Sequence, residues 1–220
     1  MMIKPKICAV ITSATASIIE SAEPHADLFE LRIDMIGPDW ASIIPLIHKP
    51  WIATCRLKSE GGAWDASEAR RKEEILKALN CGASLIDLEL ETPNLDRLVS
   101  IIKKKSRLIL SCHNYNDTPP LKELEAIARR EFEAGADIAK IATRSNSSDD
   151  TLRILQVRRN FTDKEMITIA MGEQGILSRV LDPLMGGPFA YAAAAKGAES
   201  AEGQLTACEL RKIYSMMRTL

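Results

Sequence analysis

Short apolar runs alternate with longer amphipathic segments along the whole of this 220-residue chain. Eight runs rich in isoleucine, valine and leucine are predicted as β-strands, at residues 7–12, 28–33, 51–56, 85–90, 108–112, 138–142, 166–170 and 189–194. Most of them are continuously apolar, which is typical of parallel strands that are covered on both faces. Their alternation with helical segments predicts a parallel α/β fold.

The segments between these runs carry apolar residues at helical spacing, most clearly at 67–80, 95–105, 120–134, 149–159 and 205–217. Thr206 and Glu209 have the residue types and the spacing of a capping box at the start of the last helix. Eight units of about 27 residues each fill nearly the whole chain. We therefore predict a single (β/α)8 TIM-barrel domain over residues 1–220, near minimal length, with an open doubly wound sheet as the alternative.

The composition excludes several classes of partner. The chain has 29 Lys and Arg against 30 Asp and Glu, a net charge of −1, so no overall field attracts nucleic acid or anionic lipid. Five cysteines form no C-x-x-C pair, which favours reduced thiols and a cytoplasmic protein. No stretch approaches the roughly 18 apolar residues of a membrane span, and the start of the chain lacks the apolar core of a signal peptide.

Charged and polar residues collect at the carboxyl ends of the predicted strands, where barrels place their chemistry. Glu30 and Arg32 stand two positions apart, so their side chains share one face of a strand. Such charges are costly inside a barrel unless they compensate each other or a ligand. They are explained either by structural ion pairs or by a polar active site, and their recurrence on six strands favours the active site. The set comprises Glu30, Arg32, Arg56, Asp87, Glu89, His113, Lys140, Ser178 and Arg179.

Lys140 lies in an otherwise apolar strand. Burial favours the neutral form of a lysine amine, and a neutral amine attacks ketones to form an imine. His113 ends a neighbouring strand, where an imidazole is suited to carry protons near neutral pH. Taken singly, each residue also fits a structural role, as a lysine that extends to solvent or a capped histidine. No spacing of His, Cys and Asp predicts a metal site.

In their order and spacing these residues resemble the type I 3-dehydroquinate dehydratases, the Schiff-base class of the shikimate pathway. The matching segments run from about residue 6 to the C-terminus, at 30–32, 54–56, 60–62, 87–89, 111–113, 137–140, 171–172, 178–179 and 200–204. The resemblance implies a barrel that converts 3-dehydroquinate to 3-dehydroshikimate and water without a metal or cofactor. It also implies a hydro-lyase of aromatic amino acid and chorismate biosynthesis that acts as a homodimer.

The resemblance also implies a role for each residue. Lys140 attacks the C3 ketone to form an iminium, and His113 removes the C2 proton and then protonates the departing C1 hydroxyl. Glu60 pairs with His113 and orients it, and Arg179 binds the substrate carboxylate, which a guanidinium fork fits. The remaining substrate contacts are Glu30, Arg32 and Arg56 for the hydroxyl groups, Ser200 and Gln204 from a lid after the last strand, and Met171 against the ring.

The lid departs from the small-Pro-Gly-Gln pattern of the family, because it reads Ser-Ala-Glu-Gly-Gln and carries a charge at Glu202. The effect of Glu202 on lid closure and the part played by Thr12 and Ser13 stay open. Two other functions also fit a barrel of this kind. One is a Schiff-base aldolase, which usually binds phosphate through glycine-rich loops, whereas Arg179 favours a carboxylate here. The other is a non-catalytic barrel that binds a small acid.

Overall fold

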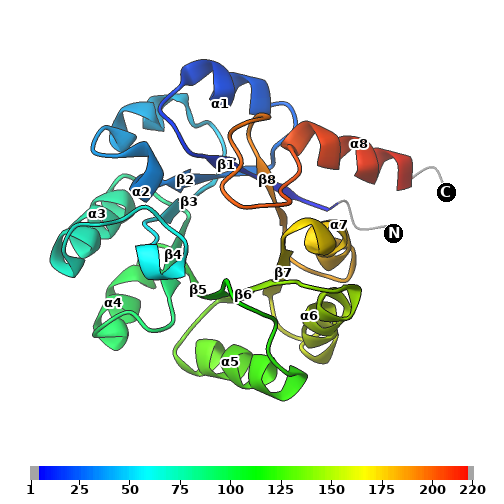
Figure 1. Cartoon of the computed structure of the whole chain (residues 1–220). Helices are drawn as coiled ribbons and strands as arrows, with labels where there is room; N and C mark the ends of the chain where they lie inside the picture. The colour runs from blue at the N-terminus through cyan, green and yellow to red at the C-terminus, as the bar shows by residue number, and fades with distance from the viewer. Residues whose placement is uncertain (1–4, 218–220) are drawn as a thin grey trace.

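Eight parallel strands form a ring at the centre of the molecule, and the helices surround them (Figure 1). The computed structural model describes residues 5–217. The strands are β1 (Ile7–Ile11), β2 (Leu28–Arg32), β3 (Trp51–Thr54), β4 (Leu85–Glu89), β5 (Arg107–Asn114), β6 (Ile138–Arg144), β7 (Met166–Met171) and β8 (Ala190–Ala193). Their order is β7-β6-β5-β4-β3-β2-β1-β8. The barrel is nearly closed, since β7 and β8 are the only neighbours without a ladder among residues 5–217, and the predicted (β/α)8 fold is confirmed.

The helices lie close to their predicted positions. They are α1 (Ala16–Ala22), α2 (Ile33–Ile36), α3 (Glu68–Asn80), α4 (Leu95–Ile102), α5 (Leu121–Glu133), α6 (Ser148–Asn160), α7 (Ile176–Leu184) and α8 (Ala207–Met217), with 3-10 turns η1 (Trp40–Leu46), η2 (Lys58–Glu60) and η3 (Glu173–Gly175). The capping box at α8 is confirmed. The Thr206 hydroxyl accepts the Glu209 amide at 3.2 Å, and the Glu209 carboxylate accepts the Thr206 amide at 2.8 Å.

Two units are less regular than the rest. After β2 the chain forms the short α2 and then η1, because Gly37 has a φ of +87° and Pro45 cannot donate a helical hydrogen bond. After β7 the chain turns sharply into η3 and α7. A Cβ at Gly175 would lie 2.1 Å from the carbonyl oxygen of Ala170, so only glycine permits this turn.

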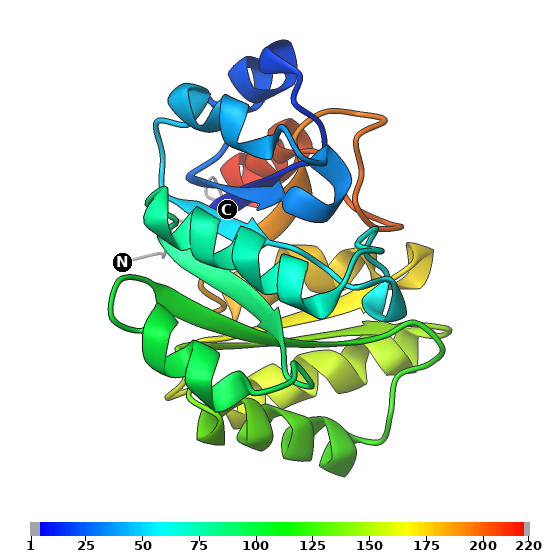
Figure 2. The ribbon, with the colours of Figure 1, turned by 90° about the vertical axis from the view of Figure 1, so that its left-hand side faces the viewer.

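Side-chain alternation along the strands separates the core into two layers. One set of strand residues packs outward against the helices, as Phe29, Leu31 and Leu110 do. The other set points into the barrel, where Ile52 and Ile138 contribute to an apolar layer. Farther along the same strands the inward positions become polar. The loop between β8 and α8 extends past these carboxyl ends, on the side opposite the start of β1 (Figure 2).

Candidate active site

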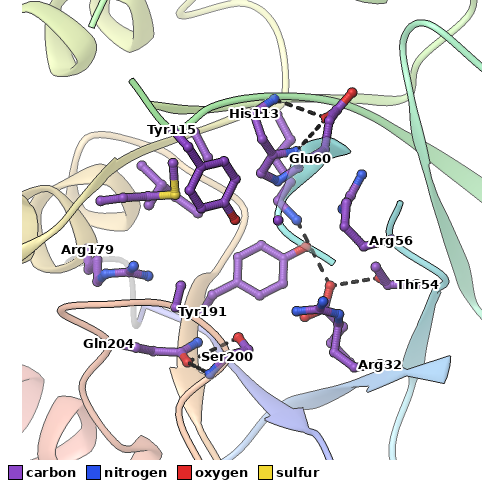
Figure 3. Close-up of a pocket in the computed structure, with 17 residues that line it drawn as sticks. Arg32, Thr54, Arg56, Glu60, His113, Tyr115, Arg179, Tyr191, Ser200 and Gln204 are labelled. Atoms are coloured by element: carbon purple, nitrogen blue, oxygen red, sulfur yellow. Dashed lines mark hydrogen bonds and ion pairs between the residues drawn. The ribbon is translucent and has the colours of Figure 1, made fainter. Parts of the chain in front are cut away.

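A pocket opens at the carboxyl ends of the strands, and all ten residues predicted for catalysis or substrate binding line it (Figure 3). Glu30 and Arg32 lie two positions apart on β2, while β5, β6 and β7 contribute one residue each, so the inward positions of different strands bring distant segments together. The lining is made of Glu30, Arg32, Thr54, Arg56, Glu60, Gly61, His113, Tyr115, Lys140, Ala142, Ile169, Met171, Arg179, Tyr191, Ser200, Ala201 and Gln204.

Lys140 projects from the middle of β6 into this pocket and is only 6% exposed. Its Nζ donates a hydrogen bond of 2.8 Å to Asp87 Oδ2 and lies 4.0 Å from Glu30 Oε1. Nζ also lies 4.3 Å from the centre of the Tyr191 ring. Two carboxylates and an aromatic face therefore surround the Lys140 amine.

Asp87 links Lys140 to the guanidinium of Arg56, which is also buried. Arg56 donates to Asp87 Oδ1 at 2.6 Å and to the Ser111 hydroxyl at 2.8 Å, and it lies 3.1 Å from Glu89. Although burial opposes ionisation, Arg56 and Lys140 hold the pKa of Asp87 well below its usual range. Asp87 therefore stays charged and fixes the position of both cations.

His113, at the end of β5, is held by Glu60 from η2. Glu60 Oε2 accepts both the backbone amide of His113 at 3.1 Å and ring Nδ1 at 2.9 Å. With a carboxylate as acceptor, Nδ1 carries the hydrogen and Nε2 keeps its lone pair. Burial, Arg56 and Lys140 together hold the pKa of His113 well below its usual value, so the ring is a neutral base. Burial also raises the pKa of Glu60 to about 7.

Arg179 comes from the second turn of α7 and is 5% exposed. The Ser178 hydroxyl positions this turn, since it accepts the Ala170 amide at 2.9 Å and donates to the Gly175 carbonyl at 2.8 Å. Arg179 makes no ion pair within residues 5–217, and its Nη2 donates only to the Glu202 carbonyl at 3.2 Å. Burial lowers its pKa to about 10. The arrangement leaves a buried guanidinium available for an anion.

Arg32 differs from Arg179 because its charge is already matched. Its Nε and Nη2 donate to the two oxygens of Asp34 at 3.0 and 2.6 Å. Glu30, on the same face of β2, accepts the Thr54 hydroxyl at 2.7 Å. Arg32 and Glu30 therefore present polar groups in fixed positions to the pocket, but Arg32 does not present a positive charge that lacks an acidic partner.

The lid loop, defined here as residues 194–206, crosses the pocket from the end of β8. Gln204 Oε1 accepts the amide of Ser200 at 2.9 Å and its hydroxyl at 3.2 Å, so the two predicted lid residues form one unit. Glu202 is not among the residues that line the pocket, and it forms an ion pair with Arg144 at the end of β6. The charge at Glu202 thus links the lid loop to the end of β6.

Several lining residues escaped the sequence analysis, chiefly Thr54, Tyr115 and Tyr191. Strand alternation was the signal for two of them, because Thr54 shares the face of Arg56 and Tyr191 lies inward on β8. Tyr115 packs over Gly61, where a Cβ would lie 2.1 Å from the tyrosine ring. Thr12 and Ser13, whose role was open, do not line the pocket.

Two further properties of the molecule bear on its class. Within residues 5–217, no group of three or more His, Cys, Asp or Glu side chains is arranged to hold a metal ion. No helix in the same span has the length and apolar character needed to cross a membrane.

Comparisons with known proteins agree with one another. The family described as Type I 3-dehydroquinase matches residues 7–220. A 3-dehydroquinate dehydratase of Dehalococcoides mccartyi is 38% identical over 210 residues, which cover 96% of this chain and 95% of the relative. The crystal structure of the Geobacillus kaustophilus 3-dehydroquinate dehydratase has a TM-score of 0.89 and 26% identity, covering 98% of this chain and 91% of that one.

A second solved structure adds a chemical detail. The type I 3-dehydroquinate dehydratase of Clostridium difficile, described with covalently modified comenic acid, has a TM-score of 0.87 and 28% identity. That likeness covers 98% of this chain and 93% of the relative. Together with the match over residues 7–220, these similarities show that the chain belongs to the type I 3-dehydroquinase family.

Proposed function

We propose that this chain is a 3-dehydroquinate dehydratase that forms 3-dehydroshikimate and water through an imine on Lys140. The observation that carries the proposal is a buried lysine amine in one pocket with a neutral histidine and with a guanidinium that has no acidic partner within residues 5–217. These are the groups needed to activate a ketone, move a proton and bind a carboxylate. The names of the relatives support the same substrate.

The first stage forms the imine. Lys140 gives one proton to Nε2 of His113, and its free amine attacks the C3 carbonyl carbon of the substrate. The protonated histidine returns this proton to the former carbonyl oxygen, which leaves as water with a second proton from nitrogen. The nitrogen keeps one hydrogen and a positive charge, so atoms and charge balance. The cation withdraws electrons from the neighbouring C2–H bond.

The second stage is the elimination. His113 takes the C2 proton, and the bonding electrons move to the nitrogen to give a neutral enamine. The enamine then expels the C1 hydroxyl, which leaves as water with the proton from His113. Water hydrolyses the product iminium, and 3-dehydroshikimate departs from Lys140. One histidine serves both steps, because its lowered pKa leaves it unprotonated before it accepts the C2 proton, and it then carries that proton until it donates it to the departing hydroxyl.

Other residues bind and orient the substrate in this scheme. Arg179 holds the carboxylate, since it is the buried guanidinium of the pocket that lacks an acidic partner within residues 5–217. Glu30, Arg32 and Arg56 hold the hydroxyl groups. Ser200 and Gln204 contact the substrate from the lid loop, and Met171 packs against its ring.

Two alternatives are less well supported. A Schiff-base aldolase uses a similar lysine, but its phosphate is usually held by backbone amides and a helix N-terminus. Arg179 and Gln204 instead present side chains at this position. A non-catalytic barrel has no need for the hydrogen bond of 2.9 Å between His113 and Glu60, which fixes the tautomer of a neutral base.

The direct test is reductive trapping. Borohydride added with 3-dehydroquinate is expected to leave a reduced adduct on Lys140, identified by peptide mass spectrometry, while absorbance follows the dehydroshikimate formed. Lys140→Ala is expected to abolish both signals, and exposed Lys105→Ala serves as the matched control. An adduct on another lysine, or turnover without any adduct, contradicts the mechanism.

We further propose that residues 1–220 act as one catalytic unit, as a homodimer in the cytoplasm. The five cysteines are all free thiols, which suits a reducing compartment. The best candidate for the dimer interface is α7. Four of the exposed large apolar side chains lie on it or directly after it, namely Ile176, Leu177, Leu184 and Met185.

A further inference from the structure

Tyr191 occupies the centre of the pocket, although neither the sequence motifs nor the proposed steps assign it a task (Figure 3). It lies inward on β8 and is 5% exposed. The centre of its ring is 4.3 Å from Lys140 Nζ. Its hydroxyl is buried and has no hydrogen-bond partner in the described part of the chain.

The ring of Tyr191 lies next to the side-chain nitrogen of Lys140. An aromatic face attracts a cation, the attraction grows as contact with water falls, and Lys140 is only 6% exposed. An ammonium has three hydrogens to share with Asp87, whereas an iminium has only one. When the imine forms, the hydrogen bonds to Asp87 therefore weaken while the attraction of the ring for the positive charge remains.

The hydroxyl of Tyr191 has a different role. A buried hydroxyl without a partner costs free energy, and such groups call for a ligand or water. Burial and the nearby Glu30 raise the pKa of Tyr191 well above its usual value, so the phenol stays neutral. A neutral phenol donates one hydrogen bond, and the expected substrate presents several hydroxyl oxygens that accept one.

We propose that Tyr191 is a further catalytic residue of this site, whose ring stabilises the cationic lysine imine and whose hydroxyl binds a hydroxyl group of the substrate. This inference rests on the proposed function and names how the same pocket stabilises its intermediate. A purely structural role is the alternative, since Tyr191 also packs edge-on against Phe189 with ring centres 5.3 Å apart.

Two substitutions separate the ring from the hydroxyl. Tyr191→Phe keeps the ring, so the fraction of Lys140 trapped by borohydride at saturating dehydroquinate is expected to stay within about twofold. KM is expected to rise about tenfold with the loss of one hydrogen bond. Tyr191→Leu removes the ring, so the trapped fraction and kcat are expected to fall about 5- to 30-fold.

Controls keep the outcome decisive. Phe29→Leu makes a similar change at a buried aromatic on the outer face of β2, away from the pocket, and is expected to leave trapping unchanged. If Tyr191→Leu does not fold, Tyr191→Met offers a flexible replacement without a ring. If Tyr191→Leu or Tyr191→Met is trapped as fully as the wild type, the proposed role of the ring is wrong. If KM is unchanged in Tyr191→Phe, the proposed role of the hydroxyl is wrong. No adduct in the wild type instead overturns the proposed function.

Discussion

The cations of the pocket are distinguished by their partners rather than by their residue types. Arg56 and Lys140 share the carboxylate of Asp87, at 2.6 and 2.8 Å. Loss of positive charge at Lys140 therefore leaves Asp87 paired with Arg56, so no isolated buried charge appears when the amine is deprotonated. Arg179 has no such partner within residues 5–217 and is thereby suited to bind an anion.

Glu60 controls the tautomer of His113, and this leads to a prediction. Glu60→Gln is expected to lower kcat about 10- to 100-fold with a small change in KM, because the ring loses the charge that orients it. With the pKa of Glu60 in the free protein raised to about 7 by burial, wild-type kcat/KM is expected to fall as pH drops through this value. The variant has no carboxyl to titrate, so its acidic limb near that pH is expected to vanish.

The measurement is kcat and kcat/KM as functions of pH from steady-state assays of both proteins. Asp65→Asn is the matched control, because Asp65 is an exposed acidic residue that pairs with Lys58 in the same segment. Its profile is expected to follow the wild type. An acidic limb retained unchanged in Glu60→Gln would assign that ionisation to another group.

At the scale of elements, α5 carries a buried acid with no evident use. Glu131 is 0% exposed, and neither carboxyl oxygen has a hydrogen-bond partner in the described part of the chain. Burial, reinforced by Asp87, raises its pKa well above the usual value. Glu131 therefore keeps its proton in the fold but releases it near pH ~4.3 in the unfolded chain. Between those two pKa values its contribution to stability falls as pH rises.

Replacing this acid is expected to stabilise the fold. Glu131→Leu is expected to increase the free energy of unfolding by about 1–3 kcal/mol at pH 8, because an unpaired polar group leaves the core. The increase in the free energy of unfolding is expected to be smaller at pH 5. Ionisation of Glu131 stabilises the unfolded wild type less at pH 5 than at pH 8, so its removal matters less there. Urea denaturation at both pH values measures it, with Glu133→Leu near the end of the same helix as the control. A destabilised Glu131→Leu at pH 8 would indicate a partner for this carboxyl.

The lid loop gives a second prediction for an element. The ion pair between Arg144 and Glu202 is partly exposed, with 38% and 53% of the side chains accessible, and such pairs contribute at most about 1 kcal/mol. Glu202→Gln is therefore expected to raise KM by about 2- to 5-fold while kcat changes little. Arg144→Gln is expected to do the same, and the double variant no more than either.

Salt provides the independent measurement for the lid loop. Added sodium chloride is expected to raise the KM of the wild type toward that of Glu202→Gln, because salt screens exposed charges. The KM of the variant is expected to change less. Identical salt dependence in the two proteins, or additive effects of the two single changes, would show that this ion pair does not hold the lid loop.

At the scale of the whole molecule, the sequence predicts the barrel well because its strands are buried on both faces. The apolar runs therefore predicted the positions of all eight strands. Because alternate residues of each strand point into the barrel, the charged residues of different strands line one pocket. Tyr191 was missed because its strand is short and alanine-rich, so alternation was the only signal for its inward position and no charged residue on the same strand reinforced it. The tether between Arg144 and Glu202 joins residues 58 positions apart, and no local pattern signals such a contact.

The outer surface leads to the last prediction, which concerns assembly. The helix α7 exposes large apolar side chains to water. Contact with the same face of a second copy of the chain would bury them and so stabilise a dimer. Sedimentation at micromolar concentration is expected to give a dimer for the wild type and a monomer for the double variant Leu177→Glu with Leu184→Glu. Leu152→Glu, at an exposed position on α6, is the control that should stay dimeric. A monomeric wild type would refute the dimer, whereas a dimeric double variant with native circular dichroism would move the interface away from α7.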